Sequence, residues 1–145
     1  MLGLAGLLLN AGLQAQISHG GSPPSVVRGV QNDLFPVFEI PAPNTKQLLA
    51  EDAFTDKHGI AMRFAVSMPV EIDLLKEGQW SRMADGTRIC RLAVSSKDAQ
   101  ALILYYSSFS IPDGADLFLY SADRSQVIGA FDHQSNYGGG GVATE

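Results

Sequence analysis

Residues 61 to 74 alternate between apolar side chains and small or polar ones, and this pattern constrains the fold more than any other. The apolar side chains occupy every even position, namely Met62, Phe64, Val66, Met68, Val70, Ile72 and Leu74. Successive side chains of a β-strand point to opposite faces, whereas a helix would scatter these residues around its axis. The alternation therefore predicts a strand with one buried face. We expect a bend or a break at Pro69, since proline cannot donate to a central ladder.

Further strand signals follow Gly59 at short and regular spacing. We expect strands at 79–81, 87–95, 101–109, 115–120 and 126–131, and the turns between them include Asp85-Gly86, Ser96-Lys97-Asp98, Pro112-Asp113-Gly114 and Ala122-Asp123-Arg124-Ser125. This spacing predicts an all-β fold, namely an antiparallel β-sandwich or jelly-roll-like domain over residues 59–145. Residues 142–145 resemble the start of another strand, so we expect this domain to be C-terminally truncated and to lack its last strand or strands.

The N-terminal part of the chain has a different character. Residues 1–15 combine an apolar stretch with a plausible cleavage site at Leu13-Gln14-Ala15, which predicts a signal peptide and a secreted or periplasmic protein. The alternative is a buried N-terminal helix, which three glycines disfavour (Gly3, Gly6 and Gly12).

Residues 16–58 are expected to form a leader that is kept extended by glycine and proline. Within this leader, Thr45 to Asp52 could form a short helix capped by Asn44 or Thr45.

Composition limits the classes of partner. The chain has 145 residues, enough for about one domain, and its net charge of −5 argues against nucleic acid and anionic membranes as partners. No apolar run long enough to span a membrane follows the first 15 residues, so we expect no membrane partner after signal removal. Cys90 is the only cysteine, and the fold must therefore be held by core burial rather than by an internal disulfide.

A catalytic or metal site is not apparent in the sequence. The three histidines, His19, His58 and His133, occupy polar or glycine-rich loops, and no serine lies in a G-x-S-x-G elbow. Asp113, Asp116 and Asp123 could hold calcium, but carboxylates between strands more often form turns. The run Gly138 to Gly141 lacks the lysine of a phosphate-binding loop. We therefore expect no catalytic residue, no metal and no cofactor.

Three aromatic residues leave a different function open. Trp80, Tyr105 and Tyr120 could form a carbohydrate-binding platform on one face of the sheet, although aromatic residues of a sandwich are mostly in the core. The corresponding alternative is a free-standing extracellular jelly-roll module that binds a carbohydrate or a surface.

An ordered set of motifs suggests a family. These motifs are Glu51-Asp52, 62–66, 69–73, 78–80, 85–92, 102–109, 111–115, 117–121, 127–131 and 141–144. In this succession the chain resembles the N-terminal regions of secreted bacterial trypsin-like serine endopeptidases of the lysyl endopeptidase type. It departs from that family at Cys90, where the family tends to have tryptophan.

The resemblance implies a non-catalytic pro- or accessory domain that precedes a chymotrypsin-like protease domain. Its partner would be this serine protease domain in cis, with the catalytic residues beyond Glu145. The domain would assist folding of the protease or keep it latent.

Overall fold

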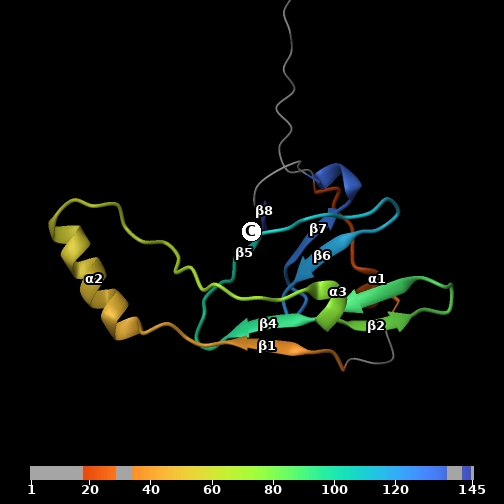
Figure 1. Cartoon of the computed structure of the whole chain (residues 1–145), viewed down its shortest axis with the longest axis horizontal. Helices are drawn as coiled ribbons and strands as arrows, with labels where there is room; N and C mark the ends of the chain where they lie inside the picture. Colours follow the sequence, from red (N-terminus) through yellow and green to blue (C-terminus); the bar gives the residue numbers. More distant parts are fainter. Residues whose placement is uncertain (1–17, 29–33, 137–141, 145) are drawn as a thin grey trace, which may run out of the picture. The chain divides into compact units, whose positions relative to one another are not determined.

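The computed structural model describes residues 18–28, 34–136 and 142–144, which belong to two compact units (Figure 1). The first unit combines the N-terminal segment up to Val27 with the chain from Leu104 onward, and the second comprises Arg28–Ile103. In the described parts of both units the strands are short and pair two by two, and the one long helix there is α2 (Thr45–Lys57). In the described residues the fold is a mixed one rich in short strands, and it shows neither a sandwich nor a jelly roll.

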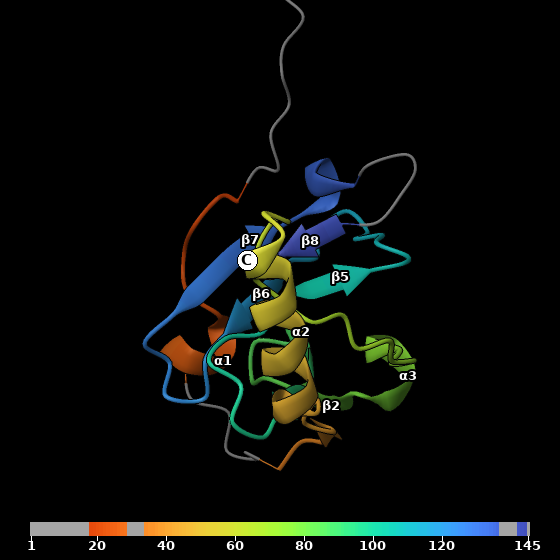
Figure 2. The ribbon, with the colours of Figure 1, turned by 90° about the vertical axis from the view of Figure 1, so that its left-hand side faces the viewer.

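The first unit is built around a hairpin. β6 (Leu117–Tyr120) pairs antiparallel with β7 (Val127–Phe131), and the two strands run side by side in both views (Figure 1; Figure 2). β5 (Leu104–Tyr106) pairs antiparallel with β8 (Val142–Thr144). A short helix α1 (Pro24–Val27) and a single 3-10 turn η1 (His133–Ser135) complete the unit.

The core of the first unit lies where β7 ends. Ile111, Ala130 and Phe131 are buried. Phe131 makes an edge-on ring contact with Phe109 at 6.4 Å between centroids, and Phe109 contacts Tyr106 in the same way at 5.3 Å. These edge-to-face arrangements are the favoured geometry for aromatic pairs, so the aromatic row fixes how β5 and β7 pack.

The second unit contains two strand pairs. β1 (Val37–Ile40) pairs parallel with β4 (Ala93–Ser96), and β2 (Gln79–Arg82) pairs antiparallel with β3 (Arg88–Arg91). A one-turn helix, α3 (Leu74–Glu77), precedes β2. The parallel β1–β4 pair corrects the prediction of a wholly antiparallel arrangement. The predicted strand 87–95 is also corrected, since it is divided into β3 and β4, which belong to different sheets.

Turn chemistry explains the two hairpins. Gly86 has a φ of +88°, which a residue with a side chain rarely adopts, and the Asp85 carboxylate accepts from the Thr87 N–H at 2.9 Å. At the β6–β7 turn, Asp123 accepts from the Ser125 N–H at 3.1 Å. Both turns were predicted from the sequence and are confirmed, as are strands near 79–81, 115–120 and 126–131 and a strand at 142–144.

The helix predicted at 45–52 is present and longer. The Asn44 side chain caps it by accepting from the Gln47 N–H at 3.2 Å, and α2 continues to Lys57. The leader contains this helix as predicted, and it also contains α1 near its start, which was not predicted. The domain boundaries at residues 15 and 58 stay predictions, and the signal peptide lies outside the described residues.

The strand predicted at 61–74 is wrong. The structure assigns neither helix nor strand to residues 60–73, and Leu74 begins α3 (Figure 1). All side chains from Ile60 to Glu71 are exposed, so the apolar positions do not form a buried face. A strand is stabilised by pairing with another strand, and among the described residues none pairs with this segment.

Candidate functional site

The exposed segment 60–73 carries the largest run of apolar side chains on the described surface. Phe64 is 93% exposed and Met62 is 78% exposed, and Val66, Met68 and Val70 are also exposed. A contiguous exposed apolar patch typically marks an interaction site, whereas single exposed apolar residues do not. We name this feature the apolar segment, residues 60–73.

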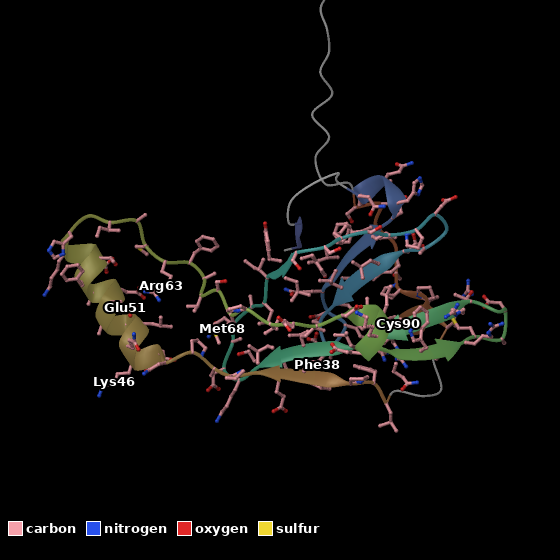
Figure 3. The ribbon with its side chains drawn as sticks, viewed as in Figure 1. Phe38, Lys46, Glu51, Arg63, Met68 and Cys90 are labelled. Carbon is pink, nitrogen blue, oxygen red and sulfur yellow. The ribbon has the colours of Figure 1, made fainter. Side chains whose placement is uncertain are left out.

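An ion-pair cluster attaches the start of the apolar segment to α2. The Arg63 guanidinium contacts the Glu51 carboxylate at 2.6 Å and the Asp52 carboxylate at 3.3 Å, and Figure 3 shows Arg63 beside Glu51. The hydrogen bond from Arg63, followed by one from Gln47, lowers the pKa of Glu51, and the Glu51 carboxylate raises the pKa of Arg63. The backbone on one side of Phe64 is therefore held while the Phe64 ring is in solvent.

A cap anchors the other end of the apolar segment. The Asp73 carboxylate accepts from the Leu75 N–H at 3.0 Å and contacts the Lys76 ammonium at 2.8 Å, which lowers the pKa of Asp73. In return, the Glu77 carboxylate accepts from the Asp73 N–H at 3.1 Å. The two hydrogen bonds are reciprocal between the N-cap residue and the helix, and α3 starts at Leu74.

Gly78, Trp80 and Cys90 lie together beside α3. Trp80 is opposite Cys90 in the β2–β3 register, and the Cys90 thiol donates to the Leu74 carbonyl at 3.2 Å. Burial raises the pKa of this thiol, so it is kept as a neutral thiol. A Cβ at Gly78 would lie 2.5 Å from both the Cys90 Sγ and the Leu74 carbonyl oxygen. The Cys90 side chain therefore packs against α3 and Gly78.

Trp80 is only partly available to a ligand. It is 40% exposed, its Nε1–H donates to the Leu75 carbonyl at 3.2 Å, and the Arg88 guanidinium lies 4.5 Å from the ring centroid. Tyr105 is 72% exposed on β5 of the first unit. The Tyr120 hydroxyl lies 3.4 Å from Ser25 Oγ. Trp80 belongs to the second unit, whereas Tyr105 and Tyr120 belong to the first.

The three histidines have different surroundings. His19 contacts Asp132 at 3.2 Å, and His133 contacts Asp113 at 3.5 Å. His58 follows α2, where its Nδ1 lies 2.7 Å from the Phe54 carbonyl oxygen. Within residues 18–28, 34–136 and 142–144, no hydrogen bond joins a serine hydroxyl to a histidine ring.

Of the three candidate metal ligands, Asp123 has hydrogen bonds that stabilise its turn. Asp123 accepts from both Ser121 and Ser125, Asp113 pairs with His133, and Asp116 is exposed. The described residues contain no group of three or more His, Cys, Asp or Glu side chains that could hold a metal ion. The glycine run 138–141 lies outside the described residues.

The N-terminal segment at Ser18 to Gly20 is hydrogen-bonded to β7. The backbone of His19 and Gly20 exchanges two hydrogen bonds with Ala130, each 3.0 Å long, and the Ser18 hydroxyl donates to the Gly129 carbonyl at 2.6 Å. The His19–Asp132 contact lies next to these bonds. Neither this attachment nor the Arg63 cluster was predicted, because each joins residues whose sequence separation carries no local signal.

Comparison with known protein families identifies the family of the chain. Residues 38–136 match the model of the lysyl endopeptidase N-terminal domain, from within β1 to the end of η1. The chain belongs to the lysyl endopeptidase N-terminal domain family. This match confirms the resemblance inferred from the motifs. The lysyl endopeptidase N-terminal domain is the part recognised here, and no catalytic domain is found in the chain. No solved structure matches it.

One further property concerns membranes. No helix among the described residues has both the length and the apolar character that a membrane crossing requires.

Proposed function

We propose that this lysyl endopeptidase N-terminal domain is the non-catalytic pro- or accessory domain of an exported serine protease. It assists folding of the protease domain or keeps that domain latent. The observation that carries the proposal is the family match over residues 38–136, and the exposed apolar segment provides a surface that a partner domain would cover. The parent protein is a serine endopeptidase, and its protease domain is the partner in cis.

The proposal includes export and a larger sheet structure. A signal peptide at residues 1–15 would direct the protein to the periplasm or outside the cell, in keeping with the secreted proteases of the family. The described sheets have two strands each, so their free edges could pair with further strands to complete a β-sandwich.

Co-refolding tests the assisting role. A denatured lysyl endopeptidase protease domain is refolded with and without the purified 145-residue chain, and the yield of active enzyme is measured with a lysyl peptide substrate. We expect a higher yield with the chain present, and serum albumin at the same concentration serves as the control. Equal yields with chain and albumin would exclude assistance in folding.

Titration of the folded protease tests the latency role. We expect the chain to lower peptidase activity in a saturable manner. The proposal as a whole is contradicted if neither refolding yield nor activity responds. It is also contradicted if the reading frame that continues past codon 145 encodes no trypsin-like domain.

A further inference from the structure

The apolar segment has the side-chain pattern of a strand without a strand partner. Even positions from Met62 to Ile72 are apolar, and no residue from 61 to 72 makes a backbone hydrogen bond within the part of the chain that the structure describes. Both the apolar face and the main-chain donors and acceptors are therefore available. An available main chain with alternating side chains is what strand addition by an extended peptide uses.

Pro69 distinguishes the two edges of this segment. In a strand, the N–H and C=O of one residue point to the same edge, and those of the next residue point to the opposite edge. The amides of odd-numbered residues form an edge interrupted at Pro69, whereas those of even-numbered residues, from Met62 to Ile72, form an uninterrupted edge. A partner strand would therefore pair along the even-numbered amides.

The charge around the apolar segment is acidic. Residues 51–77 contain six acidic and three basic side chains, which gives a net charge of −3 (Glu51, Asp52, Asp56, Glu71, Asp73 and Glu77 against Lys57, Arg63 and Lys76). Arg63 is neutralised by Glu51 and Asp52, and Lys76 is paired with Asp73. This surface favours a basic partner and disfavours a second copy of the same acidic segment, because like charges across an interface repel.

We propose that residues 62–72 are a pairing edge for one extended strand with lysine or arginine on one face and apolar residues on the other. The apolar face of that strand would continue the face of Phe64, Val66 and Met68, and its basic residues would lie near Glu71. The strand belongs to the protease domain in cis, and this assignment of its source rests on the proposed function. The strand pairing and its preference for a basic partner do not rest on the proposed function.

A synthetic peptide of alternating valine and lysine tests the edge directly. It is labelled with a fluorophore, and its anisotropy is followed while the full 145-residue chain is added. We expect saturable binding, weakened as NaCl is raised from ~50 to ~500 mM, because salt screens the acidic surface. The same peptide with glutamate in place of lysine is the control, and equal binding of both peptides would overturn the proposal.

Matched proline variants test which edge is used. Val66→Pro removes an amide from the even-numbered edge, and Ala65→Pro removes one from the opposite edge. Neither amide makes a hydrogen bond to another described residue, so both variants keep the fold. We expect Val66→Pro to weaken peptide binding at least about tenfold and Ala65→Pro to leave it nearly unchanged. A Val66→Ala variant separates loss of the side chain from loss of the amide, and equal losses in the two proline variants would overturn the assignment.

Charge reversal tests the choice of partner. Glu71→Lys should weaken binding of the lysine peptide, whereas Glu39→Lys, the same change at an exposed site on β1, should not. Equal effects of the two variants would overturn the local charge match. Concentration-dependent dimerisation with no peptide binding would show a second copy as the occupant and would also overturn the proposal. Failure of these peptide tests leaves the co-refolding result unaffected, so the two hypotheses can be told apart.

Discussion

The two units of this domain differ in how they are held together. Ile111, Ala130 and Phe131 give the first unit a small buried apolar core. In the described part of the second unit, no apolar side chain reaches the same degree of burial, and the one buried residue there is Arg91. Both units have strand pairs, and the second unit also has the capped helices α2 and α3 and the exposed ion pairs of Arg63 and Lys76.

The difference indicates where a partner would act. Burial of apolar area is the main favourable term in folding, whereas an exposed ion pair contributes little. Regions with few buried apolar contacts open most readily and are often those that bind. We therefore expect the first unit to be the more stable one in the absence of a partner, and the second unit to be the one that a partner would stabilise.

The largest expected difference is between alanine substitutions of two phenylalanines, one in each unit. Phe131 is 3% exposed and Phe64 is 93% exposed. Phe131→Ala should lower the free energy of unfolding by about 3–5 kcal/mol, because it leaves a cavity beside Phe109. Phe64→Ala should change it by less than about 0.5 kcal/mol. Urea unfolding of both variants measures this, and similar losses would show that the apolar segment is buried in solution.

The next largest effect on stability is expected at Gly78 in the second unit, where neighbouring atoms leave no room for a side chain. Gly78→Ala places a methyl group 2.5 Å from the Leu74 carbonyl oxygen and from Cys90 Sγ, so α3 must shift. We expect a loss of about 1–3 kcal/mol, the usual range for overpacking. Thermal unfolding provides the measurement. Cys90→Ala is the companion variant, and in the Gly78→Ala background it should recover only part of the loss, because the backbone clash persists.

In the first unit, the side-chain amide of Asn136 is hydrogen-bonded to the backbone of Ile111, in the loop that precedes the β6–β7 hairpin. Asn136 donates to the Ile111 carbonyl and accepts from the Ile111 N–H, both at 2.7 Å. Asn136→Ala leaves these backbone groups unpaired beside a buried side chain and should cost about 1–2 kcal/mol. Asn136→Asp keeps the acceptor but places a carboxylate oxygen against the Ile111 carbonyl oxygen, so it should also be less stable than the wild type. Identical stabilities of the wild type and the alanine variant would remove this link from the description of the first unit.

The smallest expected effect is a pH dependence at the β6–β7 turn. Hydrogen bonds from the Ser121 hydroxyl and from the Ser125 N–H and hydroxyl lower the pKa of Asp123 from 3.8 to about 2. The folded-state pKa lies below the unfolded one, so this stabilisation is present above 3.8 and disappears as the pH falls toward 2. Asp123→Asn should therefore reduce the decline in stability between pH ~5 and pH ~2. An unchanged pH profile of urea midpoints would contradict it.

The sequence predicted the local features of both units well. Asp85-Gly86 specified its hairpin, because glycine permits the positive φ and aspartate caps the turn. Asn44 marked the start of α2 for a similar reason. These signals act over a few residues, so they can be recognised without knowledge of the tertiary fold.

Non-local features were not predicted. The alternation at 61–74 describes a segment that could be a strand, but a strand forms only where another strand pairs with it, and the sequence does not name that partner. The Arg63 cluster and the attachment of Ser18 and His19 to β7 likewise join residues that are distant in sequence. The sequence therefore showed the alternating pattern of the candidate site, whereas only the structure showed that its side chains are exposed.

The exposure of residues 60–73 also has a consequence for proteolysis. Endopeptidases bind substrates as extended chain, and exposed segments without helix or strand are the usual sites of cleavage. A copy of this domain whose apolar segment is unoccupied presents the peptide bond after the exposed Phe64 to endopeptidases that cleave after aromatic residues, whereas a copy paired with a partner strand does not. Cleavage there would separate α2 from α3 and would remove the unpartnered copies selectively.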